Sequence, residues 1–164
     1  MELDPSPYGV NSHVAADVIE RLASWGLRWH RVDFCWSEIA VAPQEYDWSV
    51  PDAIVQTAED CGVSLLVCAA YTPRWASRAE DQMGLDLRLL DALPPLDPQY
   101  YVDFVRALVT RLPAGRIHCL SLWNEPNDPR QFWRGARRSR LRSWSSRLAR
   151  GRGDGAGAAD LSGA

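Results

Sequence analysis

The chain has 164 residues, 46% of them hydrophobic and eight of them Trp, so it can bury a sizeable core as a single domain. The net charge of −3 hides a split: residues 1–130 hold 19 acidic residues against 10 Arg, whereas residues 131–164 hold 2 against 8. The four cysteines form no C-x-x-C pair, so neither a zinc site nor a disulfide framework is indicated, and no cofactor is expected. No signal peptide or membrane-spanning run is visible, so no membrane partner is expected, and the localisation is left open with the cytoplasm as the default.

The N-terminal stretch predicts a strand, a helix and a second strand. Residues 8–11 are a short strand candidate, and three apolar residues then recur at helical spacing: Val18, Leu22 and Trp25. Residues 27–34 alternate as a strand does, which places Arg31 and Asp33 on one face and His30 on the other. A face this polar is unusual for a strand in a protein core.

A second helix and the clearest strand follow. Ser49 is predicted to cap a helix that ends at Gly62, which stands where a left-handed C-terminal residue belongs. Residues 63–70 form a continuous apolar run, as expected of a parallel strand buried on both faces. Residues 77–96 are polar, acidic and proline-bearing, which predicts a long loop or an irregular insertion.

The last regular elements are a third helix and a fourth strand. Asp97-Pro98 starts the helix by the cap-then-proline rule, and its apolar stripe comprises Tyr101, Phe104, Val105, Leu108 and Leu112. Residues 117–123 form the strand, and His118, like His30, is expected in the core because it lies inside a strand pattern. Strands alternating with helices across long connections predict a parallel sheet, for which doubly wound and barrel folds both remain open.

The placement of polar and aromatic residues favours the barrel. Such residues lie at or just past the end of each predicted strand: Asn11 and His13, Asp33 and Trp36, Tyr71 and Trp75, then Asn124 and Glu125. A (β/α)8 barrel builds its active site at this edge. The predicted fold is therefore α/β of the TIM-barrel type, with about the first four βα units in residues 1–135.

Residues 136–164 have a different composition. They are rich in Arg and Ser and then in Gly and Ala, which predicts a low-complexity tail, either disordered or translated out of frame. A short amphipathic helix remains the alternative, because three apolar residues could share one helix face: Leu141, Trp144 and Leu148. The Arg residues alone do not point to a specific nucleic-acid partner, and none is expected.

Five short motifs follow one another along the chain. They are Gly9-Val10-Asn11, Arg31-Val32-Asp33 with Trp36 and Glu38, Tyr46-Asp47-Trp48, Thr72-Pro73-Arg74-Trp75-Ala76, and Trp123-Asn124-Glu125-Pro126-Asn127 with Phe132-Trp133. Together they resemble the first half of a clan A retaining glycoside hydrolase, and the last is most similar to glycoside hydrolase family 39. The match covers roughly residues 8–135.

The resemblance implies that Glu125 is the general acid/base and that Asn124 bonds the 2-hydroxyl of a sugar in an oligo- or polysaccharide. A glycosidic oxygen leaves poorly unless it is protonated, so the acid needs surroundings that disfavour its charge. Contacts to the 2-hydroxyl strengthen as the ring approaches an oxocarbenium ion. The competing interpretation of Glu125 is an exposed acid that caps a turn.

Other residues acquire weaker roles from the same resemblance. Arg31 resembles an arginine inside the barrel mouth, with a salt bridge to Asp33 as its alternative. Aromatic rings can pack against the apolar face of a pyranose, and ordinary core packing is the alternative for each candidate: Trp36, Trp75, Phe132 and Trp133. His13 could face the sugar from the end of the first strand. The oligomeric state is left open.

One required group has no counterpart in the sequence. Retaining hydrolysis needs a second carboxylate about 5 Å from the acid, and in clan A this nucleophile follows the seventh strand. The predicted strands reach only the fourth. We therefore expect a fragment with little or no activity of its own, with a non-catalytic carbohydrate-binding chain and a non-functional truncated product as alternatives.

Overall fold

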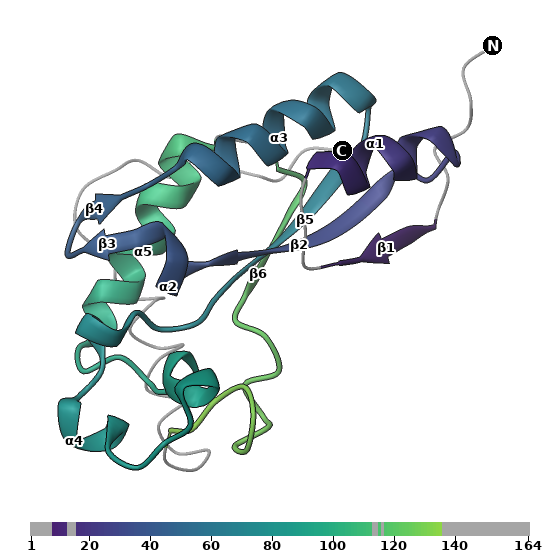
Figure 1. The fold of residues 1–164 in the computed structure, drawn as a ribbon. Coiled ribbons are helices and arrows are strands. Elements are labelled where there is room, and N and C mark those ends of the chain that lie inside the picture. The colour runs from purple at the N-terminus through teal and green to yellow at the C-terminus, as the bar shows by residue number, and fades with distance from the viewer. Residues whose placement is uncertain (1–7, 13–15, 113–114, 116, 136–164) are drawn as a thin grey trace, which may run out of the picture. The chain divides into compact units, whose positions relative to one another are not determined.

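Four parallel strands in the order β1-β2-β5-β6 form the main sheet of the computed structural model (Figure 1). The structure describes residues 8–12, 16–112, 115 and 117–135. The strands are β1 (Gly9–Asn11), β2 (Trp29–Cys35), β5 (Ser64–Ala70) and β6 (Cys119–Leu122). All of them belong to one compact unit, Met1–Arg134. Residues 136–164 lie outside the described residues, so the predicted boundary and tail stay predictions.

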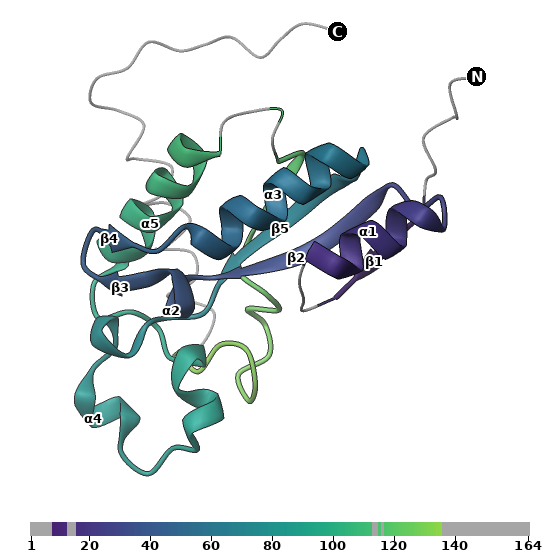
Figure 2. The same cartoon turned by 45° about the horizontal axis from the view of Figure 1, so that its top comes forward.

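Three longer helices connect successive strands of this sheet: α1 (Ala16–Ser24), α3 (Ser49–Cys61) and α5 (Pro98–Arg111). Figures 1 and 2 show α1 and α3 side by side along one face of the sheet. The third helix is tied to β5, because the Tyr101 hydroxyl donates a hydrogen bond of 2.7 Å to the Ala69 carbonyl. The predicted βα alternation and the parallel sheet are confirmed.

The helix ends agree with the sequence prediction in two cases and differ in one. Asp97 caps α5 by accepting a hydrogen bond from the Gln99 amide, and Gly62 ends α3 with a left-handed φ of 65°. The predicted cap at Ser49 is wrong, because Ser49 already lies in the first turn of α3. The Ser49 backbone amide donates to Asp47 Oδ1 at 2.9 Å, so the side chain that bonds the first turn of α3 is that of Asp47.

Trp25, which shares the helical spacing of Val18 and Leu22, lies at the surface, and so does His118, which was predicted in the core. Trp25 is 67% exposed because α1 ends at Ser24, and the buried face of that helix is formed by Ile19 and Leu22. His118 is exposed because it precedes β6, which pairs only with β5 among the described strands. His30 is buried, as predicted.

Several short elements were not predicted. A single-turn helix α2 (Trp36–Ile39) leads into an antiparallel hairpin of β3 (Ala40–Ala42) and β4 (Glu45–Tyr46). The predicted irregular insertion is confirmed, because its described helices are short: α4 (Ala79–Gln82) and η2 (Leu87–Ala92). Another short helix, η1 (Arg74–Ala76), lies just before it. Elements of two to six residues are too short to produce a clear period.

The two faces of the sheet differ in character, and β2 shows this most clearly. His30, Val32 and Phe34 are buried on the face that packs against the helices. The alternate residues, including Arg31 and Asp33, lie on the opposite, open face. β6 forms one edge of the described sheet, and its Leu122 is 46% exposed. No helix in the described ranges is long and apolar enough to cross a membrane.

Replacing Gly9 with alanine should destabilise the sheet, because a Cβ there would lie 2.6 Å from both the Cβ and the carbonyl oxygen of Trp29. These atoms belong to or adjoin the backbone of β2 and cannot turn aside. We expect the free energy of unfolding to fall by about 1–3 kcal/mol in a urea titration. Gly62→Ala is the control: it meets nothing within 4 Å and carries only the left-handed penalty, about 1 kcal/mol. Equal effects would contradict the close approach at Gly9.

The four cysteines are free thiols whose reactivity should follow their exposure. Cys119 is exposed, whereas Cys68 is buried and burial raises its pKa. Burial, reinforced by the charge of Glu38, raises the pKa of Cys35 to about 12. Because the thiolate is the reacting form, iodoacetamide should modify Cys119 at least roughly tenfold faster than Cys35 or Cys68 in the native chain, as measured by peptide mass spectrometry. Comparable rates would indicate that β5 and β6 open readily.

Candidate active site

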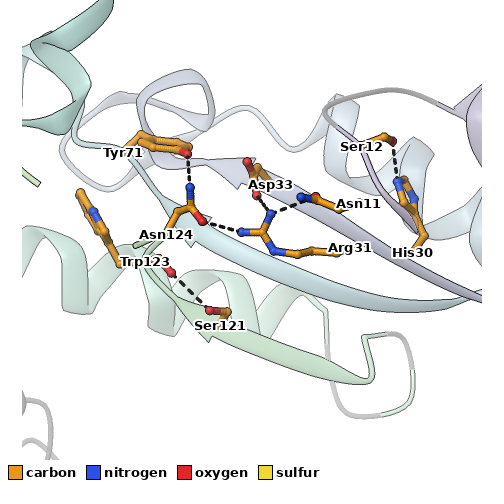
Figure 3. A network of polar contacts seen from close by, with 9 residues as sticks. All are labelled: Asn11, Ser12, His30, Arg31, Asp33, Tyr71, Ser121, Trp123 and Asn124. Atoms are coloured by element: carbon orange, nitrogen blue, oxygen red, sulfur yellow. Dashed lines mark hydrogen bonds and ion pairs between the residues drawn. The ribbon is translucent and has the colours of Figure 1, made fainter. Parts of the chain in front are cut away.

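A network of polar side chains joins the C-terminal ends of the parallel strands, with Arg31 at its centre (Figure 3). Its Nη1 donates to Asn11 Oδ1 at 3.0 Å and lies 3.3 Å from Asp33 Oδ1. Its Nη2 donates to Asn124 Oδ1 at 2.9 Å. One guanidinium therefore links β1, β2 and the residues that follow β6. Since carboxyl ends of parallel strands meet at one edge, residues far apart in the sequence converge there.

The alternation of β2 explains why Arg31 and Asp33 share this position. Both side chains stand on the open face of the strand, two residues apart. The Asp33 side chain is only 5% exposed and that of Arg31 is 24% exposed. A carboxylate this buried needs a charged neighbour, and the guanidinium supplies it. The alternative of an Arg31–Asp33 salt bridge is thus confirmed, and Arg31 binds Asn124 at the same time.

Both ends of the Asn124 amide are hydrogen-bonded. While Oδ1 accepts from Arg31, Nδ2 donates to the Tyr71 hydroxyl oxygen at 3.1 Å. Burial raises the pKa of Tyr71 to about 12, and the hydrogen bond from Asn124 opposes part of this rise. The phenol is therefore neutral near pH 7. Tyr71 was noted in the sequence at a strand end but was not assigned to the site.

The backbone departs from ordinary strand geometry where the network is anchored. Tyr71, Trp123 and Glu125 have φ values of 73°, 75° and 39°, a region that non-glycine residues rarely occupy. Tyr71 directly follows β5, and Trp123 directly follows β6. The Trp123 amide still bonds the Ala69 carbonyl at 2.9 Å, so the turn begins immediately after the ladder. Strain of this kind clusters at functional sites.

Trp123 fixes the start of the loop that carries Asn124 and Glu125. Its ring is buried and packs edge-on against Trp133, with centroids 4.8 Å apart. Its Nε1 donates to the Phe132 carbonyl at 2.8 Å. The contact between Trp123 and Trp133 therefore joins the two ends of the loop, which holds Asn124 next to Arg31.

Glu125 itself is exposed. Its carbonyl accepts a hydrogen bond of 2.9 Å from the Asp128 amide, which makes a tight turn. Within the described ranges, the Glu125 carboxylate has no hydrogen-bond or ion-pair partner. The structure therefore places the predicted acid beside Asn124 but does not enclose it.

The predicted sugar platforms lie mainly in the core. Trp36 is completely buried among Trp75, Tyr101 and Phe104, and Trp133 is buried against Trp123. A ring covered on both sides cannot stack on a sugar, so core packing describes Trp36 and Trp133 in this structure. Trp75 is half-buried and its Nε1 donates to the Ala40 carbonyl at 3.0 Å. None of these three tryptophans joins the network around Arg31.

Of the histidines singled out in the sequence, His30 and His118 are described by the structure. His13, predicted to face the sugar, lies outside the described residues. His30 shares a hydrogen bond of 2.8 Å with Ser12 Oγ behind the network, and burial lowers its pKa. Among the residues that the structure describes, no group of three His, Cys, Asp or Glu side chains could hold a metal ion.

A hollow of about 350 Å³ lies on the open face of the sheet, beside the network. Asn11, Arg31 and Leu66 line it together with Gly9 and Trp29. Val10 and His30 complete its lining, and it is open to solvent. The Arg31 guanidinium, which donates to Asn124, therefore stands beside an open hollow.

No protein-family model matches the sequence, and no curated protein matches it. Several solved structures are similar. A family 39 glycoside hydrolase from Bacteroides cellulosilyticus WH2 is 21% identical, with a TM-score of 0.55 over 76% of this chain and 26% of that one. A glucosidase from Croceicoccus marinus is 12% identical, with a TM-score of 0.56 over 78% of this chain and 30% of that one. Another glycoside hydrolase is 16% identical, with a TM-score of 0.56 over 86% of this chain and 47% of that one.

These similarities establish the fold. The chain has the architecture of part of a TIM barrel, with parallel strands alternating with helices, as predicted. A family 39 enzyme is among the similar structures, in agreement with the resemblance of the sequence motifs. The chain spans less than half the length of each of these three structures.

Proposed function

We propose that this chain is part of a retaining O-glycoside hydrolase and supplies its general acid/base, Glu125, and its sugar-contacting amide, Asn124. One observation carries the proposal. The side chains of Arg31, Asn124 and Tyr71 are hydrogen-bonded in series at the carboxyl edge of a parallel sheet. Asn124, the middle residue of the series, immediately precedes Glu125 in the chain. This is the edge at which TIM-barrel enzymes place their catalytic groups.

The geometry of Asn124 suits a contact to the sugar 2-hydroxyl. A guanidinium carries only donors, so the end of the amide that faces Arg31 is the oxygen. The other end is then the NH2 group, of which one hydrogen bonds Tyr71 and the second is available to a sugar oxygen. A contact that strengthens as the oxocarbenium ion forms would accelerate the reaction. Glu125, the next residue, would protonate the leaving oxygen.

We further propose that the nucleophile belongs to βα units beyond the four described here. Retaining enzymes hold their two carboxyl groups about 5 Å apart, and in the resembling clan the second follows the seventh strand. The limited share of the similar structures that this chain covers, 26%, 30% and 47%, supports a part of a larger barrel. On this proposal residues 1–135 are the barrel portion and residues 136–164 are a separate tail.

The isolated chain should therefore release no detectable nitrophenol from 4-nitrophenyl β-glycosides, because an acid without a nucleophile cannot complete the retaining reaction. The assay compares the wild type, Glu125→Ala and a control, Glu45→Ala, which removes an exposed carboxylate from β4. Turnover that Glu125→Ala abolishes and Glu45→Ala preserves would contradict the proposed lack of a nucleophile. Turnover insensitive to Glu125→Ala would contradict its role as the acid.

A second candidate function is carbohydrate binding without hydrolysis, and the exposure of Glu125 favours it. A proton donor near neutral pH needs surroundings that enclose it and exclude water, whereas Glu125 is exposed in the described part of the chain. Asn124 and Arg31 could still bind hydroxyl groups. Quenching of tryptophan fluorescence by a saccharide, lost in Asn124→Ala, with no hydrolysis on addition of further βα units, would favour this alternative.

A further inference from the structure

The Tyr71 hydroxyl acts as an acceptor toward Asn124, so its own O–H hydrogen is not used in that bond. Arg31 can only donate, so it fixes Oδ1 as the near end of the Asn124 amide and Nδ2 as the far end. Nδ2 in turn can only donate, which makes Tyr71 Oη the acceptor of the 3.1 Å bond. The hydrogen of the phenol is not used in this bond. No acceptor for it is found among the described residues.

Asn124 and Tyr71, which are hydrogen-bonded to each other, therefore each carry one hydrogen with no acceptor among the described residues. One is the second N–H hydrogen of Asn124 and the other is the O–H hydrogen of Tyr71. Each polar group is half-buried, so water can accept its hydrogen in the free chain, and a ligand that displaces this water must supply oxygen acceptors in its place. Adjacent donors with no protein acceptor favour a ligand with vicinal oxygen atoms, as neighbouring hydroxyl groups of a sugar ring provide.

We propose that Tyr71 is a further sugar-binding residue of this site, which accepts a hydrogen bond from Asn124 and donates its own to a hydroxyl of the same sugar. The proposal rests on the proposed function. Tyr71 is the first residue after β5 and has a left-handed φ of 73°, an uncommon conformation of the kind that clusters at functional sites. A phenol keeps its proton across the neutral range, and burial raises the pKa of Tyr71 further, to about 12, so the donor is present there.

The hydrogen bond is tested first without any sugar. In a chain labelled with ¹⁵N, the side-chain NH2 resonances of Asn124 should shift in Tyr71→Phe, and their hydrogens should exchange several-fold faster with water. Tyr46→Phe serves as the matched control, because Tyr46 lies in the hairpin strand β4, outside the network. Unchanged Asn124 resonances in Tyr71→Phe would show that the hydrogen bond between the two side chains is not made, and that result would overturn the proposal.

The sugar contact is tested by titration with methyl β-D-glucopyranoside and with its deoxy analogues. Tyr71→Phe should weaken binding of the glucoside roughly tenfold, and it should have no effect on the analogue that lacks the hydroxyl bound by Tyr71. Equal affinities of the wild type and Tyr71→Phe for every ligand would overturn this inference while leaving the proposed function intact. Failure of the wild type to bind the glucoside would contradict the proposed function, and the inference with it.

Discussion

Replacing Arg31 with methionine should lower the free energy of unfolding by about 3 kcal/mol, because it removes the charged neighbour of a buried carboxylate. The Asp33 side chain is 5% exposed and its Oδ1 lies 3.3 Å from Arg31 Nη1. The same substitution removes the donors to Asn11 and Asn124. The partial exposure of Arg31, 24%, places the expected loss at the lower end of the range for buried pairs. Urea unfolding measures it.

The double variant Arg31→Met/Asp33→Asn separates charge from packing. If the uncompensated carboxylate causes the loss, the neutral amide should restore roughly half of it or more. Sugar binding should remain impaired in the double variant, because Asn124 still lacks the donor that fixes its amide. Equal stabilities of the single and double variants would contradict the electrostatic explanation.

Trp36→Ala should lower the free energy of unfolding by about 3–5 kcal/mol, because it truncates a large, fully buried ring. The ring is fully buried, stacks on Phe104 at a centroid distance of 5.8 Å and meets Trp75 edge-on at 6.0 Å. Its removal leaves a cavity between α5 and the segment that follows β2. The free energy of unfolding from a urea titration is the appropriate measurement.

Trp36→Phe is the matched control for this truncation. It retains an aromatic ring in the cluster and removes the Nε1 group, which has no hydrogen-bond partner among the described residues. A loss of only about 1–2 kcal/mol is expected. If Trp36→Ala were tolerated as well as Trp36→Phe, the ring would not be in the core, and its predicted role as a sugar platform would regain support.

Much of the fold could be predicted because its signals are local. The apolar run of β5, the Asp97-Pro98 helix start and the left-handed Gly62 each have a physical cause within a few residues. Exposure was harder to predict. Trp25 matches the helical period but lies beyond the helix end, and the environment of His118 depends on which strands lie beside β6.

The candidate site could be predicted only in part. The polar face of β2 and the residues after β6 marked Arg31 and Asn124, and the structure joins them by a direct hydrogen bond. The contribution of Tyr71 follows from its bond to Asn124, a contact between residues 53 positions apart, which no local pattern encodes. The tryptophans illustrate the opposite problem: the same side chain serves cores and sugar platforms, so sequence could not separate the two roles.

The most direct test of the account is to map sugar binding onto the chain. Backbone and side-chain resonances of the ¹⁵N-labelled protein would be followed during titration with methyl β-D-glucopyranoside, in the wild type and in Asn124→Ala. We expect chemical-shift changes centred on Asn124, Tyr71 and Arg31, and we expect them to disappear in Asn124→Ala. Shifts that map to another surface, or that persist unchanged in Asn124→Ala, would contradict the claim that this strand edge is a sugar site.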